Sequence, residues 1–370
     1  GYPMAKTKSK LPYYITLLFL VLAVAGIVLA IQLTRGRQEQ PPVDHGVAAK
    51  NGQKFLMDTY VTQTTYDQSE DAQQKLEQVF DMLTEFENKV SRHIPGSEIS
   101  QINAGAGVTV VDVSPEVYKL VRRSRDLSRE SKGLFDITIG PLVKAWGITT
   151  DSPRVPDAEE LKDLVKRVDA YKVNLHDQNE TVFLSDPYME LDLGGVAKGY
   201  ACDLVREKYR ELGLSDGMIS LGGNIYSFGK KGDGTDYTIG LRDPFGDADD
   251  IYGSITAPDK IISTSGGYER YFEQDGKRYI HILNPKTGYP VESDLAAVTV
   301  ISEDGLLADF LSTTLFSAGK EALLEHINSE EYDGEEYDVI AVDNDRNIYL
   351  SDGIRDSFVL TNQADFRLAE

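Results

Sequence analysis

The feature that most constrains this chain is a run of 24 consecutive uncharged residues, Leu11 to Thr34, near its N-terminus. As a helix, such a run is long enough to cross the ~30 Å hydrocarbon core of a bilayer. A cleaved signal peptide has a shorter apolar region, and here the small-x-small site Ala23-Val24-Ala25 lies inside the run. A buried core helix rarely extends this far without a polar face. We therefore expect residues 11–34 to form a transmembrane anchor.

The charges on either side of the run indicate its orientation. Three lysines precede it, and two arginines follow it at positions 35 and 37. Because cytoplasmic flanks carry the excess of basic residues, we expect a single-pass protein of the cell membrane. Residues 1–10 would be a basic cytoplasmic tail, and the rest of the chain would lie outside the cytoplasm. Residues 1–3 precede the first methionine and resemble a fusion remnant, which has no bearing on the fold.

Charge also limits the partners of the chain. The formal net charge is -22, and residues 1–45 carry five basic and two acidic side chains, so the remainder carries -25. Such an acidic body does not attract nucleic acid or anionic lipid through its surface field. A phosphate-bearing substrate would need a metal ion or a few well-placed cations. Cys202 is the sole cysteine, which excludes an internal disulfide.

The remaining chain is typical of one α+β domain. Residues 35–48 contain glutamines and prolines and are expected to be a stalk linker, followed by a domain over residues 49–370. Apolar spacing predicts a helix over Ser69–Val90, a capped helix starting at Ser114, and another over 157–168. The segment Tyr188–Leu193 is expected to be a strand that leads into a helix ending at Gly213.

The second half is predicted to be rich in strands. We expect strands over 218–221, 237–241, 261–264, 278–283 and 297–301, then helices over 306–317 and 320–327, and strands near Val339 and Ile348. Strands interleaved with helices in this way favour mixed or antiparallel sheets with packed helices over a doubly wound sheet. The tail after Ile327 is acidic through residues 330–336, and we expect it to be peripheral.

The segment Glu190–Tyr200 is the most informative for chemistry. Gly194 and Gly195 stand at the expected strand-to-helix junction, where a ligand can approach the backbone and the free N–H groups favour an anion. Asp192 and Lys198 bracket that junction with opposite charges. A plain turn with a solvated lysine is the alternative, because Gly-rich turns are common. The spacing is not that of a Walker motif.

A second pattern suggests a metal site. Asp309 and Thr313 are four residues apart on a predicted helix and therefore face the same way. A carboxylate and a hydroxyl are hard oxygen ligands suited to Mg²⁺. The alternative is that Asp309 caps or solvates the helix while Thr313 bonds back to a carbonyl. Paired cysteines and histidines are missing from the pattern, which argues against zinc.

Four further segments are candidates for binding. The stretches 262–270 and 279–288 bring Ser, Arg and His281 near a Pro-Gly turn, and could supply phosphate donors and a general base. His281 could equally be a core-edge histidine. The stretch 133–147 contains Phe135 and Trp146, which could simply be core residues, and residues 91–103 form a polar loop after the first long helix.

In order and spacing, these segments closely resemble the FAD:protein FMN transferase family, the ApbE-like flavin transferases. The resemblance covers roughly Phe55 to Gly319 and five motifs. It implies a single domain that takes FAD as substrate, uses Mg²⁺ to cleave its pyrophosphate, and attaches FMN through a phosphoester bond to a Ser or Thr hydroxyl of an acceptor protein. AMP is released.

The resemblance also implies a set of site residues. The metal ligands fall on Asp309 and Thr313, with a backbone carbonyl from Gly195, and His281 is hypothesised to be the base that takes the acceptor's hydroxyl proton. The FAD contacts fall on Met57, His93, Leu134, Phe135, Asp136, Asp192, Lys198 and Leu283. Two positions depart from the family pattern: His93 stands where many relatives have tyrosine, and Asn284 where aspartate is common.

The same resemblance implies the partners. Acceptors would be exported or membrane redox proteins that carry a short Ser/Thr flavinylation motif, and an anchored enzyme would meet them at the same surface. That motif is not evident in this chain, so self-flavinylation is not expected. One alternative is an FAD pyrophosphatase that forms FMN and AMP with water. Another is a non-catalytic surface flavin-binding protein, although such a carrier would not need the pair Asp309 and Thr313.

Overall fold

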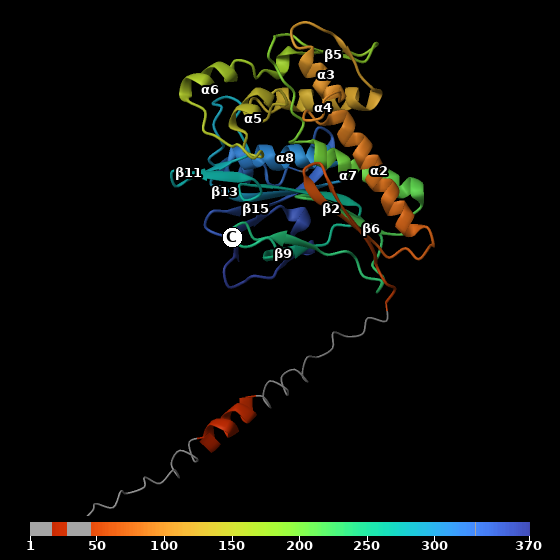
Figure 1. Ribbon diagram of the computed structural model, residues 1–370, viewed down its shortest axis with the longest axis vertical. Helices are drawn as coiled ribbons and strands as arrows, with labels where there is room; N and C mark the ends of the chain where they lie inside the picture. The colour runs from red at the N-terminus through yellow and green to blue at the C-terminus, as the bar shows by residue number, and fades with distance from the viewer. Residues whose placement is uncertain (1–16, 28–45, 330) are drawn as a thin grey trace, which may run out of the picture. The chain divides into compact units, whose positions relative to one another are not determined.

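The computed structural model describes residues 17–27, 46–329 and 331–370. Residues 17–27 are helical with exposed side chains and are the described part of the predicted anchor. The predicted basic tail, the rest of the anchor and most of the stalk lie outside the described residues. Among the residues described, no helix combines the length and apolar character needed to cross a membrane. Residues 47–370 form one compact unit (Figure 1).

In the described part of that unit, ten strands form a central sheet. Nine of them follow the order β1-β2-β6-β7-β10-β13-β15-β16-β18, and β14 pairs with β15 outside this path. The pairs are antiparallel apart from β16 with β18, which is parallel. In the stated order the strands span Lys50–Leu56, Thr59–Thr65, Gly217–Leu221, Asn224–Phe228, Lys260–Gly266, Leu295–Ser302, Glu335–Asp343, Asn347–Leu350 and Arg367–Leu368, with β14 at Glu331–Tyr332. The predicted α+β class is confirmed.

The segment after Ile327 takes an interior place in this sheet, so the expectation of a peripheral tail is wrong. Strand β15 lies between β13 and β16, and the side chains from Val339 to Val342 have no exposed surface. The acidic residues that suggested a peripheral tail lie around the β14–β15 turn, ahead of this apolar stretch. A local excess of charge therefore did not predict whether the strand that follows it lies inside the sheet or at its edge.

The two faces of the sheet carry separate hydrophobic layers. On β10, Ile261 belongs to one layer and Ile262 to the other, as the alternation of side chains along a strand requires. One face is covered by α2 (Ala72–Val90), α7 (Ala197–Leu212) and α8 (Gly305–Ala318), as Figure 1 shows. The opposite face packs against a small sheet ordered β17-β9-β8, with strands Phe358–Leu360, Ile251–Ile255 and Ile239–Arg242.

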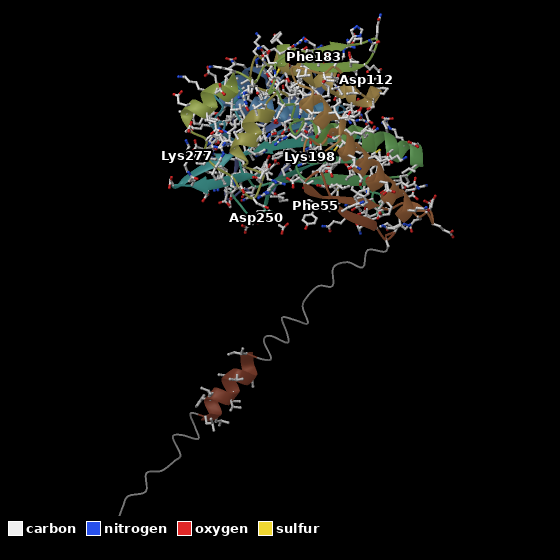
Figure 2. All side chains as sticks on the ribbon, turned by 45° about the horizontal axis from the view of Figure 1, so that its top comes forward. Phe55, Asp112, Phe183, Lys198, Asp250 and Lys277 are labelled. Atoms are coloured by element: carbon white, nitrogen blue, oxygen red, sulfur yellow. The ribbon has the colours of Figure 1, made fainter. Side chains whose placement is uncertain are left out.

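A further group of elements lies beyond the helical layer, at the top of Figure 1. It comprises α3 (Glu98–Ala104), α4 (Pro115–Glu130), α5 (Gly140–Trp146), α6 (Ala158–Val165), η1 (Ala170–Lys172) and the sheet β3-β5-β4 at Val111–Asp112, Thr181–Leu184 and Val173–His176. The remaining described elements are the hairpin β11–β12 (Tyr271–Gln274, Lys277–Ile280), whose Lys277 is labelled in Figure 2, α9 (Lys320–His326) and η2 (Asp352–Ser357).

Local sequence signals set several helix ends as predicted. The Ser114 hydroxyl accepts a hydrogen bond from the backbone N–H of Val117, and Pro115 is the first residue of α4. At the C-terminal end of α7, Gly213 has φ of 69° and provides the left-handed cap. The predicted helix over 306–317 is also present, as α8.

The predicted strand over Tyr188–Leu193 is absent from the described structure. Met189, Leu191 and Leu193 alternate into the core as predicted, but the segment makes only one isolated bridge, between Ile139 and Glu190. The Asn103 side chain accepts a hydrogen bond from the N–H of Leu191 (2.7 Å) and donates one to the carbonyl oxygen of Leu191 (3.1 Å). A side chain thus replaces the neighbouring strand that the apolar alternation suggested.

Helices α7 and α8 cross with their backbones in contact. A Cβ atom on Gly199 would lie 2.1 Å from the carbonyl oxygen of Gly305, and one on Gly305 would meet Gly199 at the same distance. Any side chain at either position would push the helices apart. This contact fixes how far α8 stands from α7.

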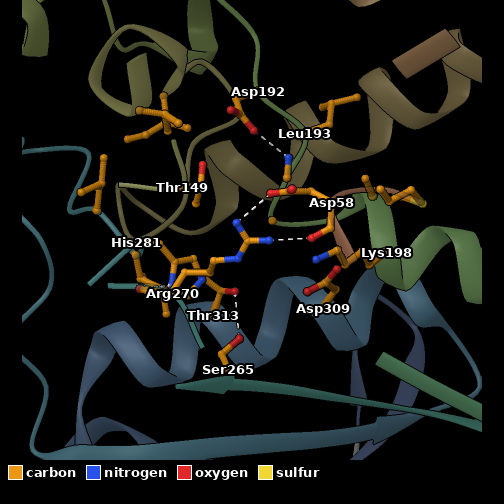
Figure 3. A pocket seen from close by; sticks show the side chains of 18 of the residues that line it. Asp58, Thr149, Asp192, Leu193, Lys198, Ser265, Arg270, His281, Asp309 and Thr313 are labelled. Carbon is orange, nitrogen blue, oxygen red and sulfur yellow. Dashed lines mark hydrogen bonds and ion pairs between the residues drawn. The ribbon is translucent and has the colours of Figure 1, made fainter. Parts of the chain in front are cut away.

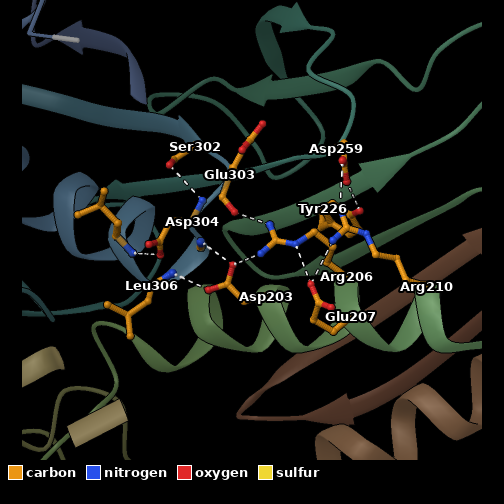
Figure 4. Close-up of polar contacts among 12 residues, drawn as sticks. Asp203, Arg206, Glu207, Arg210, Tyr226, Asp259, Ser302, Glu303, Asp304 and Leu306 are labelled. Atoms are coloured by element: carbon orange, nitrogen blue, oxygen red, sulfur yellow. Dashed lines mark hydrogen bonds and ion pairs between the residues drawn. The ribbon is translucent and has the colours of Figure 1, made fainter. Parts of the chain in front are cut away.

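Two aspartates cap the start of α8 (Figure 4). Asp203 of α7 accepts hydrogen bonds from the backbone N–H groups of Gly305 (2.8 Å) and Leu306 (3.1 Å). Asp304 accepts from Leu307 at 3.0 Å. Burial raises the pKa of Asp203 to about 6, partly offset by these donors and by Arg206. The caps set the direction in which the later residues of α8 point.

Candidate functional site

A cavity of about 370 Å³ opens between the helical layer and the loops above it. Figure 3 shows part of its lining. All twelve residues predicted from sequence line it: Met57, His93, Leu134, Phe135, Asp136, Asp192, Gly195, Lys198, His281, Leu283, Asp309 and Thr313. These residues come from widely separated parts of the chain, so the fold gathers the predicted set in one place.

Asp309 and Thr313 lie at the floor of the cavity, one turn apart on α8 (Figure 3). Asp309 Oδ2 accepts the backbone N–H of Gly199 at 2.9 Å, and its Oδ1 lies 3.4 Å from the Ser263 hydroxyl. The Thr313 hydroxyl lies 3.2 Å from that of Ser265. Serines of β10 therefore support both predicted metal ligands from below.

The Asp309 carboxyl is in an unusual electrostatic position. Burial raises its pKa to about 7, while the Gly199 N–H and Lys198 act in the opposite direction. The nearby Glu269 raises the pKa further. Glu269 itself has a pKa raised to about 7 by burial, against the influence of Lys198. Two carboxyl groups in a poorly solvated pocket are a setting in which a bound cation stabilises the ionised forms.

Lys198 lies near both carboxyl groups, whose pKa values it lowers, and a Cβ on Gly222 would lie 3.9 Å from its Nζ. In the described structure its ammonium makes no hydrogen bond or salt bridge, whereas the other lining cations are paired. Arg92 Nε binds Asp192 at 2.6 Å, and Arg270 Nη1 binds Asp58 at 2.8 Å. Lys198 is thus available to an anionic ligand.

His281 has a geometry suited to accepting a proton. Its backbone N–H and its ring Nδ1 both point to the Arg270 carbonyl oxygen, at 3.0 and 3.1 Å. A carbonyl can only accept, so Nδ1 carries the proton and Nε2 is the acceptor. Burial lowers the pKa of His281 to about 4, with Lys198 and Arg270 adding to the effect. The ring is therefore neutral near pH 7.

Two predicted aspartates are already engaged within the protein. Asp192 binds Arg92 through Oδ2 and caps the N–H of Gly194 through Oδ1 at 2.8 Å. Asp136 accepts from the backbone of Thr138 (2.8 Å) and of Ala170 (3.1 Å), one with each oxygen. These bonds hold the loops that carry their neighbours, a role the sequence did not indicate.

The apolar part of the predicted set forms one wall. A Cβ on Gly195 would lie 2.5 Å from Cε2 of Phe135, so the ring packs directly on the glycine. Phe135 makes an edge contact with Phe310 of α8, with 5.2 Å between ring centroids. Leu134 is 37% exposed, while Leu283 is buried. Met57 has φ of 51° and donates its N–H to Glu87, which fixes the turn between β1 and β2.

Trp146, the single tryptophan of the sequence, is fully buried behind this wall. Its indole N–H donates to the Gly288 carbonyl at 2.7 Å. Its ring lies 5.5 Å from that of Tyr279, two residues before His281. The predicted alternative of a core role holds for Trp146, which supports the turn after His281.

Several lining residues were missed from sequence. Asn224, Glu269 and Arg270 face the cavity together with Arg92. Glu269 and Arg270 stand in a segment singled out for its Ser and Arg content, and Arg92 stands in the polar loop, so composition offered a weak signal. Asn224 follows Gly222-Gly223 on a different strand and offered none.

The atoms predicted to hold the metal are of the kind that bind hard cations. The predicted ligands are one carboxylate, one hydroxyl and one backbone carbonyl, all oxygen. Elsewhere in the described residues, as here, no three His, Cys, Asp or Glu side chains gather into a metal-binding group. The proposed site therefore depends on oxygen atoms of several chemical types.

Comparisons with known proteins identify the relatives of the chain. The model of the ApbE family matches residues 57–336. An FAD:protein FMN transferase of Klebsiella pneumoniae (strain 342) is 39% identical over 273 residues, which is 74% of this chain and 83% of the relative. One of Treponema pallidum (strain Nichols) is 35% identical over 259 residues, covering 66% and 72%.

Solved structures agree with this assignment. The crystal structure of the ApbE protein of Thermotoga maritima has a TM-score of 0.75 and 31% identity, covering 83% of this chain and 98% of that one. The flavin transferase ApbE from Vibrio cholerae has a TM-score of 0.73 and 26% identity, covering 84% and 100%. The predicted resemblance and the prediction of a transferase are confirmed at this level.

Proposed function

The chain belongs to the ApbE family, and on that premise we propose that it is a Mg²⁺-dependent FAD:protein FMN transferase. A Ser or Thr hydroxyl oxygen of an acceptor protein attacks the FMN phosphorus of FAD. A new P–O bond forms, the bond from that phosphorus to the bridging oxygen breaks, and AMP leaves. The observation that carries the proposal is the gathering of all twelve predicted residues around one cavity.

The cavity floor fits a divalent cation. The Asp309 carboxyl is buried, has its pKa raised to about 7, and makes no salt bridge in the described structure. The Thr313 hydroxyl and the Gly195 carbonyl would complete a set of hard oxygen ligands. When bound, Mg²⁺ would neutralise charge on the phosphate oxygens and hold them in line.

The protein's own residues would divide the remaining work. Lys198, which has no partner in the described structure, would bind the pyrophosphate next to the Gly194-Gly195 turn. His281 Nε2 would accept the proton of the attacking hydroxyl, because Nδ1 is held by the Arg270 carbonyl. The aromatic and aliphatic wall of Leu134, Phe135 and Leu283 would exclude water from one side of the flavin nucleotide.

The location of the enzyme is part of the proposal. Residues 11–34 would anchor it as a single pass in the cell membrane, with the catalytic domain outside the cytoplasm. The support is the uncharged length of that run and the three lysines ahead of two arginines. Acceptors would then be exported or membrane redox proteins with a Ser/Thr flavinylation motif.

A direct test follows AMP formation. The protein is incubated with FAD and Mg²⁺, with and without an acceptor domain, and AMP and the acceptor mass are measured. We expect AMP with acceptor, together with an acceptor heavier by one FMN linked through phosphate. AMP formed equally without acceptor would mean an FAD pyrophosphatase, and no AMP in either case would mean a flavin-binding protein.

The proposed role of Asp309 in metal binding is tested with a variant at that position. Asp309→Ala should abolish Mg²⁺-dependent AMP formation, because it removes the one carboxylate of the proposed ligand set. Asp249→Ala, at an exposed loop position, is the matched control and should behave as wild type. Unchanged Mg²⁺ dependence in Asp309→Ala would exclude the assignment.

A further inference from the structure

Asn224, the first residue of β7, carries a buried amide without a partner. Only 5% of the residue is exposed, and its Oδ1 is fully buried without a hydrogen bond. In the described structure neither end of the amide has a hydrogen-bonding partner. Leaving such a group unsatisfied is costly, so native proteins rarely do so without a ligand or a water in place. Asn224 also lines the cavity.

Sheet register places this amide next to the proposed metal ligands. Asn224 pairs with Ser263 across β7 and β10. Directly paired residues of antiparallel strands point to the same face, with Cβ atoms about 4.5–5.5 Å apart. The Ser263 hydroxyl lies 3.4 Å from Asp309 Oδ1, on the face that α8 covers. The Asn224 side chain therefore stands about one side chain away from the Asp309 carboxylate.

The groups around this amide are mainly acceptors. A Cβ on the preceding Gly223 would lie 2.6 Å from Oε1 of Glu269, so that carboxylate rests against the turn leading into Asn224. Asp309 supplies a second carboxylate, and a phosphate-bearing substrate would bring more acceptor oxygens. Among the described residues that line the cavity, Lys198 is the one lysine. Its single positive charge lies near the carboxyl groups of Glu269 and Asp309. A divalent cation would match such a corner.

We propose that Asn224 supplies its amide oxygen to the cation site of Asp309 and Thr313. This inference rests on the proposed Mg²⁺-dependent function. It adds a fourth oxygen donor to the site. This donor comes from the central sheet, whereas the other three come from α8 and the Gly194-Gly195 turn. The neutral amide adds a ligand without adding a third carboxylate to the site.

Cation binding measured without turnover tests the proposal. Mg²⁺ and Mn²⁺ are titrated calorimetrically into the full-length protein, alone and with saturating ADP as a non-reacting diphosphate. Asn224→Ala should weaken cation binding about tenfold or more, the range seen when supporting groups of a metal site are removed. Asn224→Asp should bind at least as tightly as wild type, because it retains an oxygen. Asn174→Ala, an exposed asparagine of β4, is the matched control.

Thermal unfolding keeps the test independent of folding defects. Without cation, Asn224→Ala should melt at or above the wild-type temperature, because its amide has no partner to lose. With saturating Mg²⁺, the wild type should gain more in melting temperature than the variant. A lower melting temperature of the cation-free variant would mean that Asn224 is a structural residue, and would overturn the proposal.

The binding measurements also distinguish an error about Asn224 from an error about the proposed metal site on which this inference rests. If Asp309→Ala loses cation binding while Asn224→Ala binds like wild type, only the role of Asn224 is wrong. If Asp309→Ala binds like wild type, the proposed metal site itself fails. If Asn224→Ala weakens ADP binding without cation but leaves cation affinity unchanged, the amide contacts the nucleotide and the proposal is overturned.

Discussion

Arg270 binds Asp58 twice, with Nη1 2.8 Å from the carboxylate and Nη2 2.5 Å from the backbone carbonyl oxygen. This pairing joins the β1–β2 turn to the segment between β10 and β11 (Figure 3). The carbonyl of the same arginine holds the Nδ1 of His281. One residue thus connects the turn that carries Met57 with the proposed base.

Arg270→Lys should raise the KM for FAD by about tenfold, with a smaller effect on kcat. A lysine cannot make both contacts at once, and losing one charge-assisted hydrogen bond corresponds to roughly that factor. Steady-state kinetics of AMP release measure it. Arg278→Lys, on the exposed face of β12, is the control. An unchanged KM in Arg270→Lys would show that the turn keeps its position without this contact.

The pH profile should reveal the low pKa of His281. Because burial lowers this pKa to about 4, the base is already neutral at pH 6, and kcat/KM should hold down to about pH 5. An ordinary histidine would lose activity below about pH 6.5. Transfer rates measured from pH 4.5 to 8 at saturating Mg²⁺, which keeps Asp309 ionised, check this expectation. A limb centred near 6.5 that does not move with the Mg²⁺ concentration would contradict it, and wild-type rates for His281→Asn at every pH would remove the residue from the mechanism.

The same histidine links stability to pH. Its unfolded pKa is about 6.5 and its folded pKa is about 4, so the unfolded chain binds more protons between these values. The contribution of His281 to the free energy of unfolding therefore rises with pH through this window and is complete above about 6.5. Urea unfolding at pH 5 and pH 7 should show a smaller difference for His281→Asn than for wild type.

Gly199→Ala should disrupt the site and the fold together. The added methyl would stand 2.1 Å from the Gly305 carbonyl oxygen and 2.6 Å from Cβ of Asp309. Backbone must shift to admit it, at a cost of about 3 kcal/mol or more in unfolding free energy. Chemical denaturation measures that loss. A variant of full stability would mean that the two helices are less closely held than described.

Asp203→Ala should lower the free energy of unfolding by about 1–2 kcal/mol. It removes the acceptor for two backbone N–H groups at the start of α8. Asp163→Ala removes an exposed carboxylate that pairs with Arg167 on α6 and should cost little. Equal effects of the two substitutions in urea unfolding would argue against a capping role for Asp203.

Local signals in the sequence predicted much of the fold correctly. Ser114, Pro115 and Gly213 act through contacts a few residues away, so their roles follow from residue type and spacing. The pair Asp309 and Thr313 shares a face for the same reason. The family resemblance added the distant members of the site, since spacing alone did not relate Met57 to Lys198.

What the sequence did not reveal depends on contacts between distant segments. Alternation at Met189 and Leu191 indicated burial correctly, but the hydrogen bonds of Leu191 go to Asn103, 88 positions earlier. The interior place of β15 is likewise decided by its pairing with β13. Asn224 became a candidate only once the register with Ser263 was known. Local patterns report which face of a segment is buried, and not which neighbour covers it.

The burial of Trp146 has a practical consequence for studying ligand binding. As the single tryptophan, packed against Tyr279 and bonded to the Gly288 carbonyl, it is the one indole emitter in the protein and lies against the segment 279–288 that carries His281. Flavins absorb where tryptophan emits. Its fluorescence therefore offers an intrinsic optical readout of flavin occupancy, without any attached dye.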